Sequence, residues 1–335
     1  VSDCTLDPVF NSATTEYSCT VKNSVTSVTV NATATSSKSK VRGLGTKELA
    51  VGKNTLPIRV IAEDGSEKIY NIKVTRRISI QNISIFGKKF ETIDSEPTLT
   101  TTSMMAGDES GLYVSTATNT GKPTYYFRGN VTNNYVSFAG TIWRIVRINE
   151  DGTIRIIMQA GINNSIGYSL NANKVGQYFY YSNSNAKSIL ENWYQANIGS
   201  KSDLAKNVVN GDYYCEQAKI DNTANYMPSF ECKNDVNNKG LVNSNIGLIT
   251  TDEIIYAGGH FKETKNNYYL YNRIYTWTMS PAKNSGNHYL WAIDPSGVVY
   301  IESIGNTLIL RPVINLKSDT QASGTGTSSD PFVVE

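Results

Sequence analysis

Histidine is scarce in this chain of 335 residues, and so are the patterns on which most enzyme sites are built. The two histidines, His260 and His288, stand 28 positions apart outside any HExxH pattern, so a histidine-ligated metal is not indicated. None of the four cysteines is in CxxC spacing, and no GxSxG elbow is present to activate a serine. We therefore expect no catalytic residues and no enzyme activity.

An excess of charge of one sign is also lacking, as are long apolar runs. The formal net charge is +2 with acids and bases interspersed, so no basic stripe is available to follow phosphates. No run of about 18 apolar residues occurs, and the chain opens at Val1 in polar, strand-like sequence. We expect no nucleic-acid partner, no membrane insertion, and a sequence that begins after any export signal.

No cofactor is expected. The acidic EDG runs would suit calcium, but no D-x-[DN]-x-[DN]-G loop is present to place it, so a structural calcium ion is left open without a site. The neighbouring acids Asp252 and Glu253 are explained by a helix N-terminus, where the helix dipole stabilises negative charge.

The four cysteines form two locally spaced pairs, Cys4 with Cys19 and Cys215 with Cys232. Two disulfides fit this pattern best, and closing loops of this length stabilises a fold by roughly 3 kcal/mol in the chain-entropy model. Disulfides persist in oxidising compartments, so we expect an extracellular or cell-surface location. The alternative is four buried free thiols in a cytosolic protein.

Residues 5–74 are predicted to form a succession of short strands. Apolar residues alternate in 25–34 and again in 56–62, and the turn Glu63–Ser66 separates the second run from Ile69–Val74. The last two runs are predicted to form a hairpin. Many short strands in so small a segment suit a β-sandwich with one inner apolar face on each sheet.

Three stretches of this segment carry a family resemblance: TLDPVFNSATTEYSCTV, NSVTSVTVNATA and VGKNTLPIRVIAEDGSEKIYNIKV. The segment resembles the cadherin-like β-sandwich repeat of bacterial surface proteins over residues 1–76, which implies a spacer or stalk module. Cys4 and Cys19 depart from the usual sequences of that family, and they predict an added staple between the first two strands.

Residues 77–103 are predicted to be a linker with one strand, because a short apolar alternation is followed by the polar stretch EPTLTTTS. Residues 104–335, richer in aromatic residues and asparagine, form the predicted second domain. We expect one helix over 185–197, and another that begins at the capping box 250–253 and stops at Gly258. Hairpins are expected over 142–158 and around the turn 294–297, so this domain is predicted to be α+β.

Four stretches of the second domain, GLYVSTATNTGKPTYYFRGN, IGLITTDEIIYAGG, YYLYNRIYTWTMSP and LRPVINLKSD, resemble an uncharacterised domain of Firmicutes surface proteins. The closing Arg311-Pro312-Val313 pattern is similar to C-type-lectin-like domains of the formylglycine-generating-enzyme type. The expected fold class is therefore mixed: an all-β immunoglobulin/cadherin-like sandwich followed by an α+β C-type-lectin-like domain. Enzymes of that fold need a reactive cysteine pair near the last strands or several histidines, and this chain has neither. The resemblance also implies a disulfide between Cys215 and Cys232.

The same fold type holds the receptor-binding proteins of diversity-generating retroelements, whose ligand surface lies just before the Arg-Pro-Val strand. By that resemblance, the ligand-binding residues here are Asn284, Ser285, Asn287, His288, Tyr289, Trp291, Tyr300, Glu302 and Asn306. Tyrosine and tryptophan supply contact area, and asparagine, serine and histidine supply adaptable hydrogen bonds. Two alternatives stay open: that Trp291 packs into the core, and that the loop 284–288 has no binding role. Core packing is expected for the other three tryptophans, and a scaffold role for Arg311.

We expect a bacterial cell-surface or secreted adhesin. Its C-type-lectin-like domain would present a binding surface for a glycan, or for a host or cell-surface protein, on a β-sandwich spacer. A pilus or cell-wall component that packs against copies of itself is the first alternative. An exoenzyme with an unfamiliar site is the second, and it would need a pocket lined by strongly perturbed titratable groups.

Overall fold

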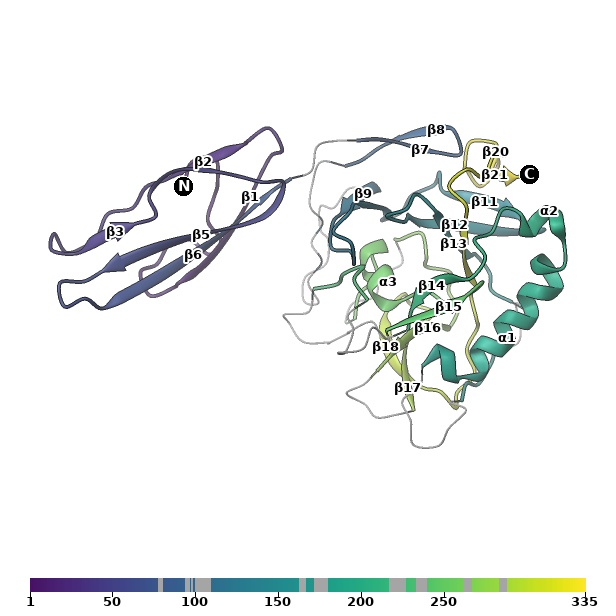
Figure 1. Ribbon diagram of the computed structural model, residues 1–335. Coiled ribbons are helices and arrows are strands. Elements are labelled where there is room, and N and C mark those ends of the chain that lie inside the picture. The colour runs from purple at the N-terminus through teal and green to yellow at the C-terminus, as the bar shows by residue number, and fades with distance from the viewer. Residues whose placement is uncertain are drawn as a thin grey trace. The chain divides into compact units, whose positions relative to one another are not determined.

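The computed structural model describes residues 1–77, 81–93, 97, 99, 110–162, 167–171, 180–216, 227–232, 240–261, 267–282 and 288–335. The chain divides into two compact units, one of residues 1–81 and one that contains residues 82–93 and 97–335, and each is described by itself (Figure 1). Most of the regular structure is β, with few helices. Within the described ranges, no helix is both long and apolar enough to cross a membrane.

The first unit is a small sandwich. A four-stranded sheet in the order β1-β6-β5-β3 and the β2–β4 pair share one apolar core. Side chains of β1 alternate between solvent and core, with Tyr17, Cys19 and Val21 inward, as the period of a strand requires. The strands are β1 (Glu16–Val21), β2 (Ser27–Val30), β3 (Lys40–Arg42), β4 (Gly45–Glu48), β5 (Gly52–Ile61) and β6 (Glu67–Arg76).

The expected hairpin of this unit is confirmed, because β5 and β6 pair antiparallel along their whole length. Its turn has Gly65 at a φ of 84°, a left-handed conformation that glycine adopts without strain. The expected disulfide between Cys4 and Cys19 is also present, with the two Cα atoms 5.7 Å apart. It joins the irregular segment before β1 to the middle of that strand, so the expectation that it links the first two strands is wrong.

A hairpin of β7 (Asn82–Ile85) and β8 (Lys88–Glu91) lies within the range 77–103 that we expected to be a linker. Ile85 and Phe90 are buried in the core of the second unit, and the Phe90 ring meets the Phe127 ring edge-on at 5.6 Å. Residues 82–93 therefore belong to the second unit, and the linker prediction is wrong for them.

The second unit is built on an eight-stranded sheet. Its main path runs β19-β13-β12-β11-β21-β20, and β10 pairs with β12 on one side and β9 on the other. The expected hairpin over 142–158 is confirmed as β12 and β13. The strands are β9 (Gly111–Ser115), β10 (Thr124–Arg128), β11 (Tyr135–Phe138), β12 (Thr141–Ile148), β13 (Ile154–Met158), β19 (Val313–Leu316), β20 (Ala322–Ser323) and β21 (Phe332–Val334).

Besides the β7–β8 hairpin, two smaller sheets are described in the same unit (Figure 1). One is the antiparallel pair of β14 (Asp212–Cys215) and β15 (Leu241–Ser244). The other is a three-stranded sheet of β16 (Thr276–Pro281), β17 (Tyr289–Ile293) and β18 (Val299–Ser303), with β17 in the middle. The turn expected at 294–297 joins β17 to β18, so this hairpin is confirmed as well.

The two expected helices are present. The helix α1 (Asn185–Tyr194) continues as a π-helical turn over Gln195–Gly199, so the predicted stop at Gly199 is right, and the short α2 (Ser202–Ala205) follows after a short break. The helix α3 (Thr251–Ala257) has the predicted capping box: Thr250 Oγ1 accepts from the Glu253 amide, and Glu253 Oε2 accepts from the Thr250 amide. It ends at Gly258, whose φ is 120°.

The tryptophans and Arg311 are largely structural. Trp143 and Trp277 are fully buried, and Trp193 is half-buried against the same core. Arg311 donates to the carbonyl oxygens of Met158 and Leu270, which holds two distant segments together. The core packing expected for these three tryptophans and the scaffold role expected for Arg311 are confirmed.

Candidate functional site

The residues expected to bind a ligand lie on and beside the β17–β18 hairpin. Asn284, Ser285 and Asn287 fall outside the described residues. His288 and Tyr289 are exposed at the start of β17, Tyr300 and Glu302 are half-buried on β18, and Asn306 is exposed in the turn that follows. Trp291 is only 5% exposed, and its ring meets the Phe261 ring edge-on at 4.9 Å, so the core alternative holds for this residue.

The hairpin register divides these residues between two faces. Tyr289 is opposite Ser303 and Trp291 is opposite Ile301, so these side chains share one face. Tyr300 is opposite Ala292 and Glu302 is opposite Leu290, which places them on the other face. The structure therefore brings Tyr300, Glu302 and Asn306 together, and it separates them from Tyr289.

Tyr300, Glu302 and Asn306 form one hydrogen-bonded group. The Tyr300 hydroxyl donates to Glu302 Oε2 at 3.0 Å, and Asn306 Nδ2 donates to Glu302 Oε1 at 2.7 Å. The Ser303 amide adds a third donor to Oε1 at 2.8 Å. The carboxylate is thus fixed in place by three donors, two of them side chains that line the same surface.

Tyr275 extends this group and was not predicted. Its ring lies edge-on to the Tyr300 ring with centroids 6.2 Å apart, and the residue is 50% exposed. Its carbonyl accepts from the Ile309 amide, a contact between segments far apart in sequence, so no local pattern could have revealed it. We call Tyr275, Tyr300, Glu302 and Asn306 the tyrosine face.

Tyr300 stays protonated. Burial raises the pKa of its hydroxyl far above the usual value, and the hydrogen bond to Glu302 raises it further. The hydroxyl is therefore a fixed donor toward Glu302 at any physiological pH.

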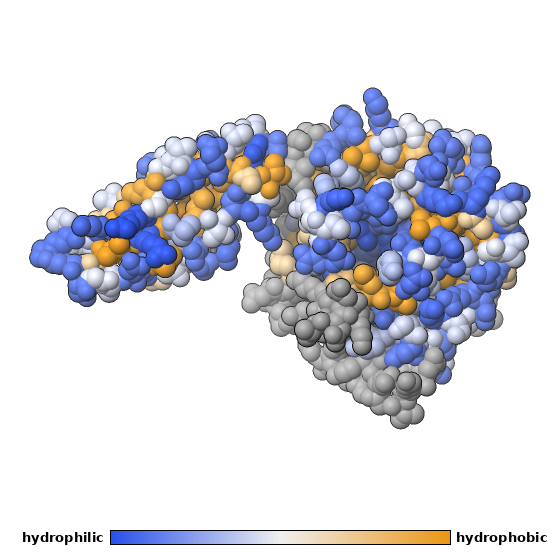
Figure 2. Space-filling model, viewed as in Figure 1, coloured by the Kyte–Doolittle hydropathy of each residue, from blue (hydrophilic) through white to orange (hydrophobic). Residues whose placement is uncertain are grey.

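A second feature of the unit is a cleft of about 350 Å³, here called the charged cleft. It lies among the N-terminus of α3, the β12–β13 hairpin, β14 and the segment 229–232. Six acidic and three basic side chains line it, the bases being Lys122, Arg147 and Arg155. The visible face of the larger unit is mainly hydrophilic around a hollow (Figure 2).

A buried ionic group forms the floor of the charged cleft. Glu253, 3% exposed in its side chain, lies 2.6 Å from Arg155 Nε and 3.2 Å from Arg147 Nε through the same oxygen, Oε1. Burial alone would raise the pKa of Glu253, but the positive charges of Arg155 and Arg147 outweigh it and hold the pKa below its usual value. The capping role expected for Glu253 is correct, and the ion pairs come in addition to it.

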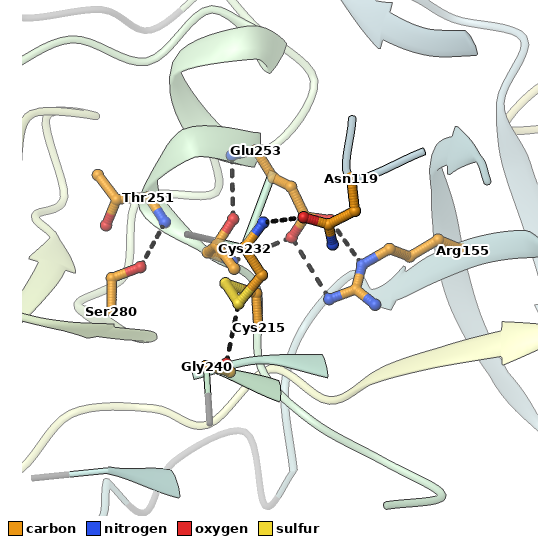
Figure 3. The surroundings of a disulfide bond; sticks show 9 residues. Asn119, Arg155, Cys215, Cys232, Gly240, Thr251, Glu253 and Ser280 are labelled. Carbon is orange, nitrogen blue, oxygen red and sulfur yellow. Dashed lines mark hydrogen bonds and ion pairs between the residues drawn. A yellow bond between two sulfur atoms is a disulfide. The ribbon is translucent and has the colours of Figure 1, made fainter. Parts of the chain in front are cut away.

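The second disulfide builds one wall of the charged cleft (Figure 3). Cys215 and Cys232 are joined as expected, with Cα atoms 5.4 Å apart. The Cys232 amide donates to Asn119 Oδ1, and the Ser229 amide donates to Asp252 Oδ1, both at 2.9 Å. These contacts attach the segment 229–232 to the loop between β9 and β10 and to the first turn of α3.

Sequence reasoning missed the cleft, although a signal for its floor was present. Arg147 and Arg155 stand inside the apolar strands TIWRIVRI and IRIIM, and a buried charge in such a strand needs a partner. The partner, Glu253, is 98 residues from Arg155 in the chain, so the pairing itself was not deducible.

The described residues contain no group of three or more His, Cys, Asp or Glu side chains arranged to hold a metal ion. The calcium ion that the sequence left open therefore has no assigned place in that part of the chain.

Comparison with known proteins gives one result. Residues 1–77 match the family model of the cadherin-like beta sandwich domain, in agreement with the sandwich described for the first unit. No curated protein and no solved structure matches the chain. The predicted family of the N-terminal segment is thereby confirmed, with a boundary one residue later than expected.

Proposed function

We propose that the chain is an extracellular adhesin in which a C-type-lectin-like second unit binds a glycan through the tyrosine face. In this proposal the cadherin-like sandwich is a spacer, as such repeats are in bacterial surface proteins. The fold assignment of the second unit rests on the resemblance of its sequence. The proposed partner rests on the chemistry of the tyrosine face.

The contact between Tyr300 and Glu302 is the observation that carries the proposal. Tyrosine rings combine an apolar face, which suits the C–H face of a sugar ring, with a polar edge that stays in water. Planar polar side chains beside them, here Glu302 and Asn306, suit paired hydroxyl groups. Because three donors already hold Glu302 in place, little side-chain entropy is lost when a ligand binds.

The location is supported by the two disulfides, which persist in oxidising compartments, and by the family of the first unit. Binding is favoured over catalysis by the charged state of Glu253, the most deeply buried carboxylate among the described residues. The Glu253 carboxylate is held in its charged form by two arginines and by the hydrogen bond that it accepts from the Thr250 amide, so it is poorly suited to exchange a proton near neutral pH.

The test is a glycan array, run beside a panel of host matrix proteins, with three forms of the full chain. These are the wild type, a Tyr275→Ala/Tyr300→Ala variant, and Tyr289→Ala as the matched control on the opposite face of the hairpin. We expect a glycan to be bound by the wild type and the control, and to be lost by the double variant.

Other results would contradict the proposal. A glycan bound equally by all three forms would place the site elsewhere. Binding to matrix proteins alone would replace the glycan by a protein partner. No binding on either panel, together with concentration-dependent light scattering, would favour a structural component that assembles with itself.

A further inference from the structure

The charged cleft shares no residue with the tyrosine face. Its buried arginines and its more exposed acidic residues lie in different parts of the cleft. We infer that it is a second binding site, for a small zwitterion: a free amino acid or a short peptide with both ends free. The carboxylate would bind Arg147 and Arg155 on the floor, and the ammonium group would bind the acids around the mouth.

The floor offers hydrogen-bond donors that the protein itself does not use. Arg155 is 3% exposed and binds Glu253 through Nε and Nη2, while Arg147 binds Glu253 through Nε and Thr124 through Nη1. Nη1 of Arg155 and Nη2 of Arg147 take no part in these contacts. In Figure 3 the remaining nitrogen of Arg155 points away from Glu253.

The charge of the floor points to an anion. Two guanidinium groups face one carboxylate, so this group keeps one positive charge in a poorly solvated place. Guanidinium groups pair with carboxylates in planar, charge-assisted hydrogen bonds, which are strongest where water is excluded. A carboxylate of a ligand would supply the missing negative charge.

The mouth has the opposite character. The carboxylates of Glu150, Asp151 and Asp212 are each positioned by hydrogen bonds from neutral groups, such as the Thr120 hydroxyl to Glu150 and the Thr153 hydroxyl to Asp151. In the described ranges, no lysine or arginine is within ion-pair distance of these three acids. They therefore favour a cationic group of a ligand.

The floor and the mouth of the charged cleft together determine the class of ligand. A simple anion would have to pass the acids of the mouth, and a simple cation would leave the floor charge uncompensated. The volume, about 350 Å³, is at the lower end of small-molecule sites, which limits the occupant to a few residues. An amino acid or short peptide satisfies the size and both charges.

The test uses isothermal titration of the full chain with the free amino acids and with alanyl-alanine at millimolar concentration. The N-acetylated and C-amidated forms of each are titrated beside them. We expect at least one free form to bind, and each cap to weaken it by about ten-fold or more, because each removes one charge-assisted contact.

Two variants connect the result to the cleft. The Arg147→Gln variant should bind the C-amidated ligand about as well as the ligand with a free carboxylate. N-acetylation of the ligand should still weaken its binding to this variant. Glu150→Gln changes a half-exposed side chain and should not affect folding. In this variant, N-acetylation of the ligand should reduce the affinity less than it does in the wild type. Glu302→Gln on the tyrosine face should bind like the wild type.

No binding by any free form, or equal binding of free and capped forms, would overturn the inference. Binding that is lost in Glu302→Gln but kept in Arg147→Gln would also overturn it. That last result would leave the tyrosine face as the site, so failure here is distinct from failure of the adhesin proposal.

Discussion

Glu253 Oε1 lies 2.6 Å from Arg155 Nε, and this contact joins the first turn of α3 to β13 of the main sheet. Both side chains are 3% exposed. Removing one partner of such a pair leaves an uncompensated buried charge, which commonly costs about 3–5 kcal/mol. We expect Glu253→Gln to lower the free energy of unfolding of the second unit by this amount.

Denaturant unfolding followed by tryptophan fluorescence measures this, because all four tryptophans lie in the second unit. The matched control is Glu191→Gln, which removes a half-exposed ion pair with Lys187 one helical turn away. Such pairs contribute about 0.3–0.5 kcal/mol. Similar losses in the two variants would contradict the structural role given to Glu253.

Acid should destabilise the second unit through the same carboxylate. The pKa of folded Glu253 is lowered, because its two arginines outweigh the effect of burial. Its contribution to stability is therefore complete above the pKa of the unfolded chain, about 4.3, and is lost as the pH falls through the folded value. Unfolding free energies measured from pH 6 down to about pH 3, which lies below the pKa of the unfolded chain, should fall more steeply for the wild type than for Glu253→Gln. Parallel curves would show that Glu253 does not titrate as described.

The capping box of α3 gives a separate prediction. Thr250→Ala removes the side-chain acceptor for the Glu253 amide, and the loss of an N-cap typically costs about 1 kcal/mol. Thr250→Ser keeps the hydroxyl and should retain most of the stability. If both variants were equally destabilised in fluorescence-detected unfolding, the lost methyl group rather than the cap would be responsible.

The β7–β8 hairpin should be needed by the second unit. Phe90→Ala removes a buried ring that contacts Phe127 and Phe332, and truncations of this kind cost about 3–5 kcal/mol. We expect this loss in the tryptophan-detected transition. Lys89→Ala on the same strand, whose side chain is exposed, serves as the control. No difference between the two would restore the linker interpretation of residues 82–93.

The disulfide between Cys215 and Cys232 should stabilise the second unit alone. Replacing both cysteines by serine opens a loop with a sequence separation of 17, for which the chain-entropy model gives about 3 kcal/mol. The Cys4→Ser/Cys19→Ser variant should leave the fluorescence transition unchanged, because that disulfide lies in the first unit. A fluorescence shift in both variants would contradict the division of the chain into independent units.

Much of the fold was predictable because its signals are local. The capping box at Thr250, the stop at Gly199 and the hairpins are set by residues within a few positions of one another. The two disulfides join cysteines close in sequence. In each case the residues that determine the structural feature lie in the same short segment that forms it.

The rest depends on contacts between distant segments. The apolar alternation of β7 and β8 could not show that Ile85 and Phe90 pack on a core built by later strands. The candidate ligand residues were taken as one stretch, but the hairpin register places Tyr289 and Tyr300 on opposite faces. Tyr275 joins Tyr300, and Arg155 joins Glu253, only once the chain has folded.

The most direct test of the adhesin proposal is titration of the glycan selected by the array into the wild type, Tyr300→Ala and Tyr289→Ala. The proposal predicts that Tyr300→Ala weakens binding by about ten-fold or more, since it removes both a ring and the donor to Glu302. Tyr289→Ala should bind like the wild type. Equal affinity of Tyr300→Ala and the wild type would contradict the assignment of the tyrosine face as the glycan site.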